Sequence, residues 1–197
     1  MFPLGRVRVS GGFVLLAAWF ILANGWEPLA TVLGAAAVHE LGHWTVLRLF
    51  GAEVTGFRVS VLGAVLETDS RRLSYGRELA AVLAGPAANL LSALTLTAVG
   101  EGRWPAAVGA NLVLCAFNLL PIRPLDGGRA LYLLAAWLMG PSAGEAAGRW
   151  AGTFTAAALA ALIGGIIWGT GGSLWLLPAL FAGLYWSVGP WLSGMRF

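Results

Sequence analysis

Long runs of apolar residues, separated by short polar connections, dominate the pattern of this 197-residue chain. A run of about twenty apolar residues is long enough for a helix to cross a bilayer. Six runs come near that length: 11–25, 28–49, 77–99, 105–121, 150–168 and 173–193. A seventh, 130–140, is shorter and predicts a short or interfacial helix. The pattern predicts an all-α polytopic membrane protein with about six transmembrane helices.

The connection between the second and third runs has a different pattern. Residues 53–61 alternate in part between polar and apolar, Leu62 and Gly63 can form a turn, and 64–67 can return. This favours a small membrane-associated β-hairpin after the second helix. One interpretation is that an exposed strand of the hairpin pairs with an extended peptide. The other is a connecting loop with no such role.

Composition and charge support a membrane location and suggest an orientation. The chain is 58% hydrophobic and 11% charged, whereas soluble domains carry about 25% charged residues. Its net charge of +3 is too diffuse to indicate a nucleic-acid partner. All twelve basic residues are arginine, and cytoplasmic termini place eleven of them inside, with Arg103 outside. We therefore expect a multi-pass protein whose two termini are cytoplasmic.

Both histidines of the chain lie in one short motif, His39-Glu40-Leu41-Gly42-His43, inside the second apolar run. On a helix, residues four apart project from one face, so the two imidazoles can bind one metal ion. Glu40 stands beside them, where it can act on a water at the metal. Ionisable groups at membrane depth are costly and usually functional. The alternative is that both histidines bond to neighbouring helices without a metal.

A second polar motif follows the fourth run and contains Pro121, Pro124, Asp126, Gly127 and Gly128. The prolines interrupt the helix, and the glycines let the backbone turn tightly. A broken helix at membrane depth is tolerated where it lines a polar cavity. Asp126 is the natural third ligand, because two imidazoles and one carboxylate leave the fourth position of zinc open. Alternatively, Asp126 is a helix N-cap that pairs with Arg129.

Two asparagines are further candidates for the site. Asn118 can donate a hydrogen bond to an oxyanion or hold a peptide, or it can bond to a carbonyl freed near Pro121. Asn89, in the third run, can line the site and contact substrate, or it can bond across helices as packing.

The His39–His43 motif, together with Asn118-Leu119-Leu120-Pro121 and Pro124–Gly128, resembles the site-2 protease family of intramembrane zinc metalloproteases. The stretch Ala84–Asn89 resembles the motif of that family's third core helix. The resemblance covers roughly 28–130, the catalytic core, within one membrane-embedded domain spanning 1–197 without a PDZ or CBS domain. The layout is most similar to the stage IV sporulation protein FB subgroup.

The resemblance implies a zinc metalloendopeptidase of a bacterial or archaeal cell membrane. His39, His43 and Asp126 would bind zinc, and Glu40 would be the general base. The substrate would be a membrane-tethered protein cut in or near a transmembrane segment, with pro-sigma factor processing in sporulation as one form. Membrane inhibitor or regulator proteins would be further partners, within the lipid bilayer. The alternative function is a non-proteolytic membrane metal-binding protein or metal transporter.

Overall fold

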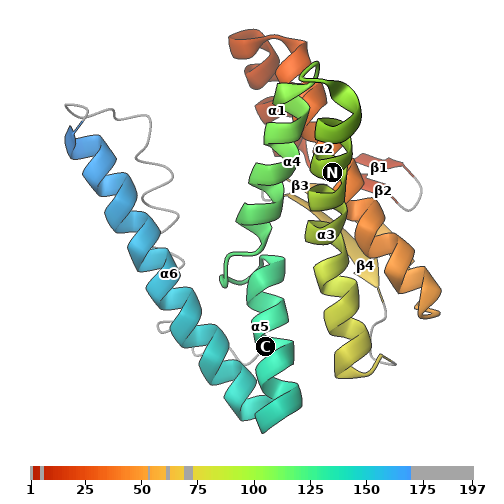
Figure 1. Ribbon diagram of the computed structural model, residues 1–197, viewed down its shortest axis with the longest axis vertical. Coiled ribbons are helices and arrows are strands. Elements are labelled where there is room, and N and C mark those ends of the chain that lie inside the picture. The colour runs from red at the N-terminus through yellow and green to blue at the C-terminus, as the bar shows by residue number, and fades with distance from the viewer. Residues whose placement is uncertain (1, 5–6, 53, 61–62, 69–72, 170–197) are drawn as a thin grey trace. The chain divides into compact units, whose positions relative to one another are not determined.

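The computed structural model describes residues 2–4, 7–52, 54–60, 63–68 and 73–169 (Figure 1). The chain divides into two compact units, Met1–Asn118 and Leu119–Phe197. Each unit is described by itself below.

Four helices form most of the first unit: α1 (Gly11–Asn24), α2 (Trp26–Leu49), α3 (Tyr75–Gly100) and α4 (Pro105–Asn118). Helices α2, α3 and α4 pack against one another, and α1 packs against α2. Small residues permit the close approach of α2 to α3. A Cβ atom added to Gly42 would lie 2.5 Å from the backbone oxygen of Ala84 and 2.7 Å from Cβ of Ala88. The α2–α3 contact therefore needs glycine at this position.

The first unit also contains a four-stranded sheet in the order β1-β2-β3-β4. Its strands are β1 (Phe2–Leu4), β2 (Val7–Val9), β3 (Val54–Ser60) and β4 (Gly63–Thr68). Strands β3 and β4 pair antiparallel, with an irregularity between Val54 and Gly56, in the segment where a hairpin was predicted. Strand β2 pairs parallel with β3 and antiparallel with β1. The strands before α1 were not predicted, because three-residue strands are too short to show alternation.

The second unit contains α5 (Asp126–Met139) and α6 (Pro141–Gly169), which pack against each other. Helix α5 begins four residues before the short helix predicted at 130–140 and ends one residue before the end of that prediction. Helix α6 begins nine residues before the predicted run at 150. Gly140, at φ +95°, separates the two helices, and Pro141 opens α6. Proline favours the first helical position because its missing N–H would have no intrahelical partner there.

Two described helices, α3 and α6, are long and apolar enough to cross a membrane. Helices α1 and α4 are apolar but shorter. Helix α2 has 24 residues, but its acidic residues, histidines and Arg48 lower its mean hydropathy. The run predicted at 173–193 lies outside the described residues. The number of spans therefore stays a prediction.

Candidate metal centre

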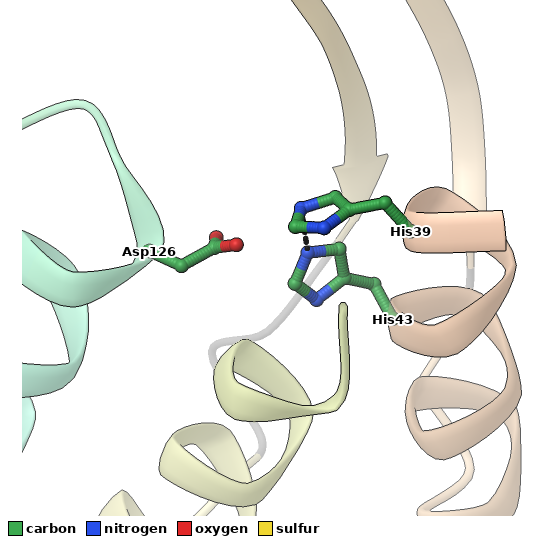
Figure 2. A group of neighbouring side chains, drawn as sticks. All are labelled: His39, His43 and Asp126. Carbon is green, nitrogen blue, oxygen red and sulfur yellow. Dashed lines mark hydrogen bonds between the residues drawn. The ribbon is translucent and has the colours of Figure 1, made fainter. Parts of the chain in front are cut away.

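His39 and His43 lie one turn apart on α2, and their rings approach each other edge-on (Figure 2). The Nε2 atoms are 3.1 Å apart, and the ring planes meet at 83° with centroids separated by 4.7 Å. His39 is buried, at 5% exposure. The helical spacing thus brings two ligand-type nitrogens to one point, as the sequence predicted.

The hydrogen bond on the other side of the His43 ring fixes where its hydrogen lies. Nδ1 of His43 donates to the backbone oxygen of Ala81 on α3, at 2.8 Å. A carbonyl oxygen only accepts hydrogen bonds, so Nδ1 must carry the hydrogen. In the neutral ring, Nε2 then presents its lone pair toward His39.

His39 is held by a side chain of α3. Nδ1 of His39 lies 2.7 Å from Oδ1 of Asn89, which is fully buried. The Asn89 amide nitrogen donates to the backbone oxygen of Ala35, at 2.9 Å, and to Oδ1 of Asn111, at 2.8 Å. Both N–H groups of Asn89 are therefore used inside the helical bundle. Asn89 therefore bonds across helices and contacts a candidate ligand, while a role toward substrate stays a prediction.

Gly85 leaves space for the His43 ring. A Cβ atom added to Gly85 would collide with Nε2, Cε1 and Cδ2 of the His43 imidazole. The sequence placed Gly85 only within the Ala84–Asn89 stretch and did not predict this contact.

Asp126 is the first residue of α5, in the second unit (Figure 2). Its N-cap neighbour is Leu125, so Asp126 lies in the first turn and is not the N-cap. Its Oδ2 atom is buried. A Cβ atom on Gly127 would collide with the Leu119 carbonyl, and one on Gly128 would lie 2.6 Å from the Ile122 carbonyl carbon. The two glycines therefore let the segment before α5 pack closely over its first turn.

The remaining candidates are Glu40 and Asn118. Glu40 follows His39 on α2 and is half-buried. Asn118 ends α4, and its amide nitrogen donates to the backbone oxygen of Leu114, at 3.1 Å. This bond lies within its own helix and does not reach a carbonyl near Pro121.

A family model matches a large part of the first unit. The model of peptidase family M50 covers residues 28–104, which include both histidines, Glu40 and Asn89. Residues 28–104, called the M50 segment below, are thus similar to this family. The resemblance to the site-2 protease family is thereby confirmed. Asp126 lies beyond the matched M50 segment.

Two relatives of the chain are named as putative zinc metalloproteases, and a third is named as a sporulation protein. The chain is 35% identical over 144 residues to a putative zinc metalloprotease, sll0528, of Synechocystis, covering 65% of this chain and 38% of that protein. It is 33% identical over 132 residues to the putative zinc metalloprotease Rip3 of Mycobacterium tuberculosis, covering 60% and 33%. It is 28% identical over 138 residues to stage IV sporulation protein FB of Bacillus subtilis, covering 66% and 47%. The matched part thus spans less than half the length of each relative.

A solved structure shares the fold of the chain. The site-2 protease from Methanocaldococcus jannaschii matches with a TM-score of 0.62 at 19% identity, covering 100% of this chain and 95% of that one. At this identity the likeness establishes the fold alone, which is the largely helical site-2 protease fold.

Proposed function

We propose that this protein is an intramembrane zinc metallopeptidase in which His39, His43 and Asp126 bind one zinc ion. The observation that carries the proposal is the pair of facing Nε2 atoms, 3.1 Å apart. Two nitrogen lone pairs at this distance repel each other unless a proton or a metal ion is bound between them. Zinc–nitrogen bonds of about 2.0–2.1 Å in tetrahedral geometry require an N···N distance of about 3.3 Å. The histidine pair therefore fits zinc closely.

Asp126 supplies the third ligand in this proposal. It offers a carboxylate oxygen, and the two histidines offer one ring nitrogen each, all of which are atom types that zinc binds. Three protein ligands leave one coordination position open, as in catalytic rather than structural zinc sites. Two imidazoles and one carboxylate therefore suit catalysis.

Glu40 is the general base of the proposed reaction. Bound zinc would supply a Lewis acid that activates water and polarises the scissile carbonyl. Glu40 takes the proton of the attacking water and delivers it to the leaving amine. Its side chain leaves the helix about 100° from that of His39, so Glu40 need not be a ligand. The HExxH spacing thus separates metal binding from proton transfer.

We place the substrate among membrane-tethered proteins, cut in or near a transmembrane segment. A helix in lipid hides its amides in hydrogen bonds, so the substrate must unwind before water can attack. Strand β4 ends the described sheet order, and such a strand can pair with an extended peptide. Regulated proteolysis, including pro-sigma factor processing under the control of membrane regulators, fits this substrate class.

The orientation of the protein follows from its arginines. Both termini and the 51–76 connection are placed in the cytoplasm, and the short 101–104 connection outside. Two membrane-capable helices and the M50 segment support a membrane location.

Glu40→Gln tests the proposed mechanism. Glutamine keeps the shape of the side chain but cannot take a proton. We expect a folded, zinc-loaded protein that cleaves a membrane substrate at least about a hundredfold more slowly. Asp126→Asn should instead lower bound zinc as well as activity, while Glu145→Gln, an exposed acid on α6, should change neither.

Elemental analysis and a cleavage assay on the same purified samples distinguish the outcomes. Wild-type cleavage by Glu40→Gln would overturn the mechanism, and full zinc occupancy in Asp126→Asn would overturn the ligand set. A metal transporter would bind zinc and show no chelator-sensitive cleavage even as the wild-type protein.

A further inference from the structure

A chain of buried hydrogen bonds runs from α4 through α3 to the first histidine. Asn111 on α4 bonds to Asn89 on α3, and Asn89 bonds to His39 on α2. Asn111 is 4% exposed and Asn89 is fully buried. We infer that Asn89 and Asn111 are positioning residues, which hold His39 in the tautomer and orientation that metal binding requires. This inference rests on the proposed zinc site.

The donor and the acceptor of each hydrogen bond in this series are fixed by two groups that can only accept. The backbone oxygens of Ala35 and Ala107 only accept. Asn89 must therefore turn its NH₂ group toward Ala35, and Asn111 must turn its NH₂ group toward Ala107, at 2.9 Å. Oδ1 of Asn111 is then left to accept the second N–H of Asn89. This leaves Oδ1 of Asn89 facing His39.

The orientation of Asn89 fixes the tautomer of His39. Because Oδ1 of Asn89 accepts, Nδ1 of His39 must carry the hydrogen, and Nε2 of the neutral ring presents its lone pair. If the Asn89 amide were rotated by 180°, its Oδ1 atom would lie against the oxygens of Ala35 and Asn111, and no hydrogen would lie between them. The asparagine pair therefore blocks the alternative tautomer, whose Nε2 hydrogen would prevent metal binding.

One helix holds both ligand histidines. Ala81, Gly85 and Asn89 are spaced four residues apart and form one row along α3. The Ala81 carbonyl holds His43, Gly85 makes room for the His43 ring, and Asn89 holds His39. His43, the later histidine, contacts Ala81, and His39, the earlier one, contacts Asn89, so α2 and α3 run in opposite directions at the site. Helix α3 therefore positions both histidine rings.

Outer partners of metal-bound histidines affect metal binding strongly. Their removal typically lowers metal affinity or activity by about 10–100-fold, because the ring loses its fixed orientation and part of its basicity. Asn89 is such a partner for His39, and Asn111 acts one step further away. The inference therefore predicts a graded loss of zinc affinity.

The test compares Asn89→Leu and Asn111→Leu with the wild-type protein. Leucine keeps the branched shape and the number of side-chain heavy atoms of asparagine and removes its polar atoms. Competition with a chromophoric chelator should give a zinc dissociation constant about 10–100-fold higher for Asn89→Leu. Asn111→Leu, which leaves Asn89 in place, should raise it by a smaller factor. The visible spectrum of the Co²⁺-loaded Asn89→Leu protein should also shift at full metal occupancy, because the ligand ring has reoriented.

The control is Ala93→Gly, one turn beyond Asn89 on α3 and 2% exposed. It weakens the packing of the same helix without touching a histidine, so its zinc affinity should stay near that of the wild type. Equal losses of zinc in Ala93→Gly and Asn89→Leu, or zinc affinities of both leucine variants within twofold of wild type, would overturn the inference. Failure of the wild-type protein itself to bind zinc would overturn the proposed function as well.

Discussion

Gly85 carries no side chain, and the His43 imidazole lies where one would be. Contacts of this kind make the candidate site sensitive to single atoms. Protein interiors are close-packed, so an added methyl group must displace its neighbours. Near Gly85 that neighbour is a proposed zinc ligand, which is also tied to the Ala81 carbonyl. The residue-scale consequence is that a small substitution on α3 changes metal binding on α2.

Gly85→Ala is expected to lower zinc affinity by about tenfold or more, in line with other losses of ligand orientation. Gly34→Ala, on α2, is the matched control, because nothing lies within 4 Å of its added Cβ atom. Titration of purified protein with zinc against a competing chelator measures both variants. Equal zinc affinities in the two would show that the His43 ring can move aside without penalty.

At the scale of elements, the packing of α5 against α6 depends on where α6 carries glycine. A Cβ atom on Gly144 would lie 2.7 Å from the backbone oxygen of Tyr132 and 2.9 Å from Cβ of Ala136. The atoms nearest to a Cβ atom on Gly148 would be those of the Arg123 guanidinium, at 3.6–3.8 Å, which is an ordinary contact distance. The two glycines lie one turn apart on α6, but only Gly148 has space for a methyl group.

We expect Gly144→Ala to destabilise the protein by about 1–3 kcal/mol, because the two helices must separate to admit the methyl group. Gly148→Ala should be neutral or stabilising by up to about 1 kcal/mol, since alanine favours the helix and fits the space. Unfolding midpoints in detergent, measured under one set of conditions, compare them. A lower midpoint for Gly148→Ala than for Gly144→Ala would contradict this account of the α5–α6 contact.

On the scale of the whole molecule, apolar side chains cover much of the described surface. Leu22 is 88% exposed, and Leu91 is 66% exposed. Extensive exposed apolar surface marks contact with a membrane or another protein. Charged side chains are few, and several of them lie near helix ends or in connections, as in the exposed pair of Glu101 and Arg103, whose charged atoms are 3.5 Å apart. This distribution agrees with a protein dissolved mainly in lipid.

The proposed orientation predicts which connections face outward. In a Cys115→Ala background, Arg103→Cys should react with a membrane-impermeant thiol reagent added to intact cells. Arg72→Cys should react only after the membrane is opened, because it lies in the connection placed in the cytoplasm. Labelling of Arg72→Cys from outside would reverse the orientation and place access to the metal site on the other face.

The sequence by itself determined the features that depend on neighbours along the chain. The four-residue spacing of His39 and His43 puts both rings on one face of any helix, so the histidine pair could be predicted. The apolar runs likewise predicted the positions of α1 to α4, and the broken helix around Pro121 and Pro124 marked the segment before α5. Each of these rests on backbone geometry that a local pattern imposes.

Tertiary structure alone decided the contacts of backbone groups, which every residue carries, and of side chains such as amides, which can both donate and accept. The Ala81 carbonyl, the missing side chain of Gly85 and the direction of the Asn89 amide are set by the packing of α3 on α2 and α4. The strands before α1 similarly depend on β2 pairing with β3, about fifty residues away. Backbone groups look alike in any sequence, and an amide can turn either way, so only the neighbours brought by folding choose their partners.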